Sequence, residues 1–283
     1  FISRLLQSKI IKPKDLERKY KYEIYANEII LLAYYIAAVN IENIYYDLRK
    51  RNEKFLNGEK NSNKISYAEF EGICLTDSFQ LSEDEQEGKI LYTKDFKDNL
   101  ERVKRQKNLP LKVIIGNPPY SIGQKSANDN AQNTKYPKLD KKIAETYSEK
   151  SSAGLNKSLY DAYIKAFRWA TDRLGSENGI IGFVTNGSWI DGIATTGFRR
   201  AIKEEFSEIY VFNLRGNQRT SGELSRREGG KIFDKGSRAP IAITFLVKNL
   251  KRAFIGYASL SRILVWCLFF LFYHSDVARI SIW

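Results

Sequence analysis

The chain has 283 residues, 43% of them apolar and 13% aromatic, with a formal charge of +13 and a pI of about 9.5. This composition is typical of a globular protein, and the length suffices for one large α/β domain or two small ones. The charge favours a polyanionic partner, nucleic acid before membrane, with a basic but ordinary enzyme as the alternative. Two distant cysteines and a single histidine argue against a disulfide framework, a metal site or a Ser-His triad, and predict a cytoplasmic protein.

In the first third of the chain, residues 1–7 predict the front of an amphipathic helix, residues 15–21 a charged connector and residues 22–26 a short strand. Residues 29–48 are apolar nearly all round, which predicts a helix buried against a sheet. Polar residues such as Asn40 and Glu42 interrupt this helix and argue against a membrane span. Further on we expect a basic surface loop over residues 49–64, a strand over 67–75 and a charged helix over 96–107.

The central stretch is a short apolar run, residues 113–116, followed by Asn117-Pro118-Pro119-Tyr120. The run predicts a buried strand, which ends where two prolines remove the backbone donors of the ladder. Residues before proline favour extended backbone, so the loop is stiff. It places an amide and an aromatic ring beyond the carboxyl end of a strand, where open α/β sheets bind ligands.

The second half alternates between strand and helix patterns. A polar loop over residues 120–157 precedes an amphipathic helix over 158–174, strands over 179–185, 209–214 and 241–247, a helix over 197–206 and a basic loop over 215–238. This order predicts a doubly wound parallel sheet. The tail, residues 250–283, carries an apolar run over 263–273 that is too short to span a bilayer. The run is compatible with a buried element, an interaction patch or sequence unrelated to the rest.

Several motifs together resemble the N6-adenine-specific DNA methyltransferases with the gamma-like motif order. The closer resemblance is to the methyltransferase region of type ISP restriction-modification enzymes, and it covers roughly residues 1–249. Besides the Asn117 motif, it rests on Ala26-Asn27-Glu28-Ile29, Ser158-Leu159-Tyr160-Asp161, Gly182-Phe183-Val184-Thr185-Asn186-Gly187-Ser188 and Leu214-Arg215-Gly216-Asn217. The resemblance implies a Rossmann-like sheet that uses S-adenosyl-L-methionine.

The chemistry of the reaction explains the catalytic residues that this resemblance implies, which are Asn117, Pro118, Pro119 and Tyr120. The exocyclic amine of adenine is a weak nucleophile because its lone pair is delocalised into the ring. The side-chain oxygen of Asn117 and the carbonyl oxygen of Pro118 can accept both amino hydrogens and so aim the lone pair at a methyl donor. Tyr120 offers a face on which an extruded base can stack. An ordinary proline loop is the alternative.

The cofactor residues that the resemblance implies are Glu28, Asp77, Phe79 and Phe1. Glu28 would accept hydrogen bonds from ribose hydroxyls, although a glutamate at a helix start is also favoured by the helix dipole alone. Asp77 and Phe79 would lie near the adenine ring of the cofactor, with an unremarkable turn as the alternative at Asp77. The family's first strand and glycine-rich loop would precede Phe1, so we expect a truncated sheet and, if these residues are the whole polypeptide, weak or no cofactor binding and no independent activity.

The substrate residues that we expect are Ser158, Tyr160, Asn186, Arg215 and Arg219. Ser158 and Tyr160 would lie near the target-base pocket unless they serve only as a helix cap, and the two arginines would contact phosphates. The resemblance implies double-stranded DNA with a flipped adenine, no metal, and fusion to helicase, nuclease and target-recognition regions. A non-catalytic nucleic-acid-binding remnant, and a methyltransferase acting on RNA or a protein amide, are the alternatives.

Overall fold

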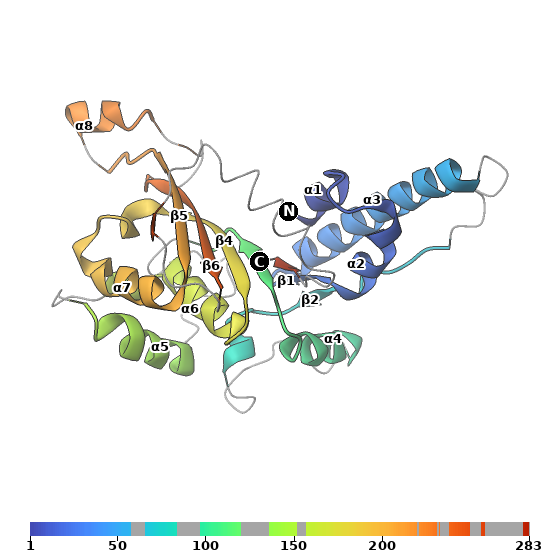
Figure 1. The fold of residues 1–283 in the computed structure, drawn as a ribbon, viewed down its shortest axis with the longest axis horizontal. Helices are drawn as coiled ribbons and strands as arrows, with labels where there is room; N and C mark the ends of the chain where they lie inside the picture. The colour runs from blue at the N-terminus through green and yellow to red at the C-terminus, as the bar shows by residue number, and fades with distance from the viewer. Residues whose placement is uncertain are drawn as a thin grey trace. The chain divides into compact units, whose positions relative to one another are not determined.

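The computed structural model describes residues 1–57, 66–83, 97–119, 136–151, 157–219, 221–230, 232, 238–249, 256–257 and 280–282. The chain divides into two compact units (Figure 1). The first unit comprises Phe1–Ser78, Lys89–Pro110 and Leu268–Trp283, and the second comprises Phe79–Gly88 and Leu111–Cys267. Tyr120 and the apolar run at 263–273 lie outside the described residues.

The first unit contains a small parallel sheet and four α-helices in its described part. Its elements are α1 (Ile2–Gln7), η1 (Pro13–Asp15), α2 (Leu16–Tyr22), β1 (Ile24–Glu28), α3 (Leu31–Asn57), β2 (Ile73–Leu75), α4 (Lys97–Lys107) and β8 (Ile280–Ile282). β1 pairs in parallel with both β2 and β8. The Tyr20 ring stacks on the Tyr45 ring with centroids 3.5 Å apart, and both side chains are buried.

Three expectations for the first unit need correction. Residues 16–22 are helical rather than a connector, because Leu16 and Tyr20, one turn apart, are both buried. α3 continues to Asn57, through half of the expected loop, and one of its faces is exposed: Leu32 is 69% exposed and Ile36 is 54% exposed. The expected strand over 67–75 is reduced to the three residues of β2.

The second unit is the larger α/β part. It contains η3 (Gln80–Ser82), β3 (Val113–Gly116), α5 (Pro137–Ile143), a π-helical turn η4 (Ala144–Ser148), η5 (Lys157–Tyr160), α6 (Ala162–Leu174), β4 (Gly179–Asn186), η6 (Gly187–Trp189), η7 (Ile193–Thr195), α7 (Thr196–Glu205), β5 (Glu208–Arg215), α8 (Gly222–Arg227), β6 (Ile241–Lys248) and β7 (Gly256–Tyr257). Its strands follow the order β3-β4-β6-β5-β7.

The sheet of the second unit is mixed rather than parallel. β3 is parallel to β4, whereas β6 lies between β4 and β5 and is antiparallel to both. A parallel neighbour needs a crossover, but the described part of the connection from β5 to β6 holds only the six-residue helix α8. The α/β class is therefore confirmed, and the wholly parallel arrangement is wrong.

Helices cover this sheet around an aromatic core. α6 packs against β4, and α5 packs against α6 (Figure 1). The side chains of Phe167, Phe183, Trp189 and Phe198 are buried and contact one another. Figure 1 shows α8 standing away from the strands at the end of its loop. Among the described residues, no helix combines the length and the apolar character needed to cross a membrane.

Two predicted boundaries in the second unit also differ. The loop expected over 120–157 contains α5 and the π-helical turn, whose buried Leu139, Ile143 and Tyr147 recur every four residues. The helix expected from residue 158 begins at Ala162, with Asp161 at the N-cap and a 3₁₀ turn before it.

Candidate active site

Three strands of the second unit end at the same edge of its sheet. β3 is parallel to β4, and both β4 and β5 are antiparallel to β6, so β3, β4 and β5 run in one direction. Asn117 follows β3, Asn186 ends β4 and Arg215 ends β5. Gly116 of β3 is paired with Phe183 of β4, which places Asn117 beside the last residues of β4. Carboxyl edges of this kind are where open α/β sheets bind ligands.

The loop after β3 begins with an exposed side-chain amide. Asn117 and Pro119 are exposed, and Pro118 between them is buried. Proline has a fixed φ and lacks a backbone donor, so the buried Pro118 holds this turn against the unit. The Asn117 amide is therefore free to meet a ligand at the carboxyl edge. Tyr120, the fourth residue of the motif, lies outside the described part of the chain.

A cavity of about 460 Å³ opens in the same unit. Its lining residues come from η5 and α6, from the end of β4 and the loop that follows it, and from the loop after β5: Ser158, Asp161, Tyr163, Asn186, Ser188, Gly192, Ile193, Ala194, Thr195 and Arg219. Of the predicted substrate residues, Ser158, Asn186 and Arg219 line this cavity, whereas Tyr160 and Arg215 do not. The cavity combines hydroxyl, amide, carboxyl and guanidinium groups, so it suits a ligand with polar edges.

Two polar atoms of the cavity wall have no hydrogen-bond partner among the residues that the structure describes. They are the Ser158 hydroxyl oxygen and one carboxyl oxygen, Oδ1, of Asp161. Asp161 is only 5% exposed, and burial raises the pKa of its carboxyl to about 6. Hydrogen bonds from the backbone amides of Tyr163 and Ala162, and the positive charge of Arg219, oppose this rise. Sequence reasoning did not select Asp161 as a site residue, although its place before an amphipathic helix is an N-cap signal.

The loop after β4, residues 187–195, is held by hydrogen bonds to its own backbone; we call it the rim loop. Arg199 on α7 donates from Nη1 to the carbonyl oxygens of Trp189 and Gly192, at 2.7 Å each. The same Nη1 lies 3.0 Å from the Thr195 hydroxyl oxygen, and this hydroxyl donates to both carbonyls. At the start of the loop, the amide of Ser188 donates to Asn186 Oδ1 at 2.9 Å. The cavity therefore has a stiff wall, whose support by Arg199 the sequence did not indicate.

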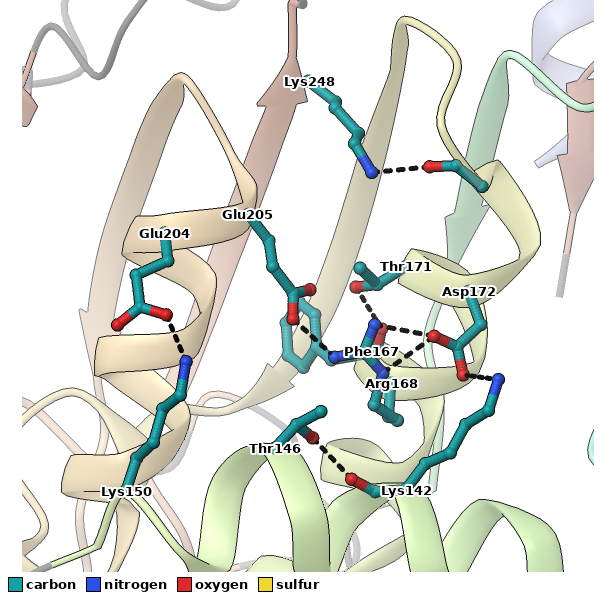
Figure 2. Close-up of polar contacts among 11 residues, drawn as sticks. Lys142, Thr146, Lys150, Phe167, Arg168, Thr171, Asp172, Glu204, Glu205 and Lys248 are labelled. Atoms are coloured by element: carbon teal, nitrogen blue, oxygen red, sulfur yellow. Dashed lines mark hydrogen bonds and ion pairs between the residues drawn. The ribbon is translucent and has the colours of Figure 1, made fainter.

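An ionic network joins α6 to α7. Figure 2 shows Arg168 of α6 between Glu205 and Asp172. Its guanidinium donates to Glu205 at 2.8 Å and to Asp172 at 2.7 Å, and it lies 5.5 Å from the centroid of the Tyr147 ring. The Arg168 side chain is only 6% exposed, so these partners compensate a buried charge. This network braces the helix that begins at Asp161.

The first unit has a polar edge of its own at the ends of β1 and β2. The Asn27 amide nitrogen donates to the Ser78 hydroxyl oxygen at 3.0 Å, and Asn27 Oδ1 is buried without a partner. Glu28 ends β1 half-buried, and its Oε1 accepts from the amide of Ile30 at 2.9 Å. Asp77, also half-buried, follows β2 and precedes Ser78. β1 and β2 pair in parallel, so Glu28 and Asp77 lie at one edge of this sheet.

Other predicted residues have different surroundings. Phe79 is buried and contacts the Tyr136 ring edge-on at 5.1 Å. Phe1 is 57% exposed at the start of α1. Arg215 is exposed with a positive φ of 63°, and its amide donates to Asn213 Oδ1. In the described part of the chain, no three His, Cys, Asp or Glu side chains are grouped so that they could hold a metal ion.

Comparison with known families identifies the class of protein. Residues 19–219 match the model of the Eco57I restriction-modification methylases, and the chain belongs to this family. The matched range includes the Asn117 loop, every residue that lines the cavity, and the polar edge of the first unit. No curated protein matches the chain.

Solved structures refine this class. The chain is 44% identical to a nuclease-deletion mutant of the Type ISP restriction-modification enzyme LlaGI in complex with a DNA substrate mimic, with a TM-score of 0.78 over 91% of the chain. It is 40% identical to the ATP-dependent Type ISP enzyme LlaBIII bound to DNA (TM-score 0.77, 91% of the chain) and 37% identical to DrdV in a DNA complex (TM-score 0.74, 92% of the chain). It spans only 20%, 17% and 23% of the lengths of those three chains.

Proposed function

We propose that the chain is the methyl-transfer part of a DNA methyltransferase that modifies the N6 amine of adenine within a restriction-modification enzyme. The observation that carries this proposal is the exposed amide of Asn117 at the carboxyl end of β3, in a chain of the methylase family. Residues 1–249 form the transfer region in this proposal.

The Asn117 loop prepares the amine for attack. The Asn117 side-chain oxygen and the Pro118 carbonyl oxygen accept the two amino hydrogens, which favours a pyramidal nitrogen with its lone pair free. The flanking prolines hold both acceptors still, so little reorganisation is needed during the reaction. Tyr120 stacks on the extruded base in this proposal.

The cavity is the proposed pocket for the flipped adenine. Its volume of about 460 Å³ lies within the range of small-molecule sites, and its wall offers unpartnered polar atoms for base edges. Ser158 and Asn186 line the pocket, and Tyr160 lies in the sequence between the lining residues Ser158 and Asp161. The pocket then rejects a wrong base through these polar groups, because a base whose edge does not match them leaves them without hydrogen-bond partners.

S-adenosyl-L-methionine, which supplies an electrophilic methyl group when bound, is the proposed cofactor. The polar edge of the first unit fits this cofactor. The Glu28 carboxylate can accept hydrogen bonds from ribose hydroxyls, and the buried Asn27 Oδ1, which has no partner among the described residues, can accept one more. Asp77 completes this set near the adenine ring of the cofactor. In this proposal, Phe79 contributes apolar contact with the same adenine ring, and Phe1 is a further cofactor residue.

Double-stranded DNA is the proposed partner, and two of the structures that the chain resembles are bound to DNA. The formal charge of +13 supports this, together with exposed arginines in the loop between β5 and β6: Arg215, Arg219, Arg226, Arg227 and Arg238. Such side chains neutralise phosphates and position a duplex without reading its sequence.

The test is transfer of tritium from labelled S-adenosyl-L-methionine to DNA, followed by chromatography of the nucleosides. N6-methyladenine as the labelled product supports the proposal. Label found only on RNA or protein favours another substrate class. DNA binding without any transfer indicates a non-catalytic binding module.

A further inference from the structure

One carboxyl in the cavity has no role in the chemistry described so far. Asp161 is 5% exposed, lines the cavity and leaves Oδ1 without a hydrogen-bond partner. Asp161 is the N-cap residue of α6, and the backbone amides of Tyr163 and Ala162 favour its ionised form. Oδ1 nevertheless has no hydrogen-bond partner among the described residues, and a buried polar atom without a partner is costly. A ligand in the cavity is the natural partner for this atom.

The proposed function limits what such a ligand can offer, and the inference rests on that function. In the proposed reacting geometry, Asn117 and Pro118 hold the two amino hydrogens of adenine from the loop after β3, outside the residues that line the cavity. The remaining polar atoms of the base are ring nitrogens, which only accept hydrogen bonds. A carboxylate only accepts as well, but a protonated carboxyl can donate. A complementary pair therefore requires a proton on Asp161.

We propose that Asp161 is a specificity-determining residue, whose protonated carboxyl donates a hydrogen bond to a ring nitrogen of the adenine in the cavity. Thymine carries a hydrogen on N3 where adenine offers an accepting ring nitrogen, so it can satisfy the Asp161 hydroxyl only through a carbonyl oxygen, in a shifted position. Ser158, the other cavity residue with an unpartnered atom, is free to assist from the adjoining 3₁₀ turn.

The groups around Asp161 are compatible with this protonation. Arg219 from the loop after β5 and the N-terminal amides of α6 favour the ionised form, whereas burial favours the neutral form. The Tyr163 phenol on α6 is itself buried, and its raised pKa keeps it uncharged. Asn186 and Ser188 at the end of β4 carry no charge. The result is a carboxyl pKa of about 6 before any ligand enters, and a base that displaces water raises this pKa further.

The experiment measures binding of labelled single-stranded DNA to the full chain by fluorescence anisotropy. One probe is nine thymidines long, and the other carries a single deoxyadenosine in place of the central thymidine. The ratio of the two affinities therefore measures the preference for adenine. We expect a preference for the adenine probe that declines as pH rises from 5.5 to 8.5. Asp161→Ala should reduce this preference about fivefold or more at low pH, the contribution expected of one hydrogen bond.

Asp161→Asn is the decisive variant, because its amide donates a hydrogen bond at every pH and asparagine is an equally good N-cap. We expect it to keep the adenine preference and to remove its pH dependence. Asp191→Ala is the matched control: this aspartate belongs to the rim loop, is exposed and does not line the cavity. Probes with 1-deaza-, 3-deaza- or 7-deazaadenine identify the accepting nitrogen, since one of them should reproduce the effect of Asp161→Ala.

The outcomes separate this inference from the proposed function. An adenine preference that survives in Asp161→Ala at every pH overturns the role of Asp161 and leaves the methyltransferase proposal standing. A chain without any adenine preference contradicts both. If Asp161→Ala does not fold, the pH profile of Asp161→Asn alone decides, and a profile that matches that of the unchanged chain overturns the inference.

Discussion

The guanidinium of Arg168 donates to the Glu205 carboxylate at 2.8 Å and thereby links α6 to α7. Both helices border the candidate site: α6 begins directly after its N-cap residue Asp161, and α7 carries Arg199, which holds the rim loop. The pairing therefore connects the stability of the unit to the two helices that flank the cavity residue Asp161 and the rim loop.

Replacing Arg168 should destabilise the protein strongly. Arg168→Ala removes a side chain that is only 6% exposed and leaves two carboxylates without their partner. Loss of one member of a buried ion pair costs about 3 kcal/mol or more. The free energy of unfolding from urea denaturation measures this. Arg227→Ala is the control, because its pair with Glu223 is 73% and 75% exposed and should contribute little. Equal losses in the two variants would contradict a structural role for Arg168.

Gly197→Ala should destabilise the protein, although glycine-to-alanine changes in helices usually stabilise. Gly197 lies in the first turn of α7, and a Cβ there would collide with the carbonyl oxygen of Tyr147 and approach the backbone nitrogen of Ser151 to 2.7 Å. Backbone atoms cannot move away as a flexible side chain can, so the usual gain of about 1 kcal/mol is reversed. Thermal unfolding compares this variant with Lys203→Ala, an exposed change in the same helix. A raised melting temperature for Gly197→Ala would disprove the close approach.

Much of this fold could be predicted from the sequence where its patterns are strong. The β-branched run at β3 and the apolar spacing of α6 specify one element each, and their bounds agree with the structure within a few residues. α5 was missed because its apolar residues occur one at a time, about one helical turn apart, and are separated by lysines. The exposed stripe of α3 was missed because the helix is apolar on several faces, and composition does not distinguish a face that is covered from one that is not.

Some residues of the candidate site could likewise be predicted from the sequence, and others could not. Asn117, Asn186 and Glu28 were found because each follows or ends an apolar strand, a position that the sequence displays directly. Asp161 acquires its meaning from burial and from an unpartnered oxygen, which depend on side chains of distant segments such as Arg219. Arg199 holds the rim loop through backbone carbonyl oxygens, and such contacts leave no residue pattern.

Loss of the Arg199 side chain should loosen the rim loop without unfolding the unit. Arg199→Ala removes the donor shared by Trp189 O and Gly192 O and leaves these carbonyls to water. We expect hydrogen exchange to speed up about tenfold at residues 187–195, which corresponds to about 1.4 kcal/mol, and DNA binding to weaken. Arg200→Ala is the control, since Arg200 is exposed on the same helix and its guanidinium donates to the carbonyl oxygen of Lys150, outside the rim loop. Unchanged exchange in the rim loop would contradict the bracing role.

The ionisation of Asp161 should also affect stability. Its pKa is raised from an ordinary value of 3.8 to about 6 in the folded chain, so the folded state binds a proton more tightly than the unfolded state does. The resulting stabilisation is present below pH 3.8 and is lost as pH rises through 6. A difference of one in pKa corresponds to about 1.4 kcal/mol, so the stability of the unchanged chain relative to Asp161→Asn should fall by about 3 kcal/mol over this range. Urea denaturation of both proteins from pH 4 to pH 8 measures the fall, and a constant difference would show that Asp161 titrates normally.

The sharpest test of the proposed chemistry is Asn117→Ala. Removing an acceptor that acts on the reacting amine should reduce methyl transfer by about 100-fold or more, since one such hydrogen bond contributes about 3 kcal/mol to the transition state. The fold should persist because the Asn117 side chain is exposed. Binding of S-adenosyl-L-methionine should be largely unchanged, because the proposed cofactor residues lie on other strands. Lys203→Ala is the control, an exposed change on α7 that leaves the Asn117 loop unaltered. Transfer by Asn117→Ala at the unchanged rate would show that the amide does not act on the amine.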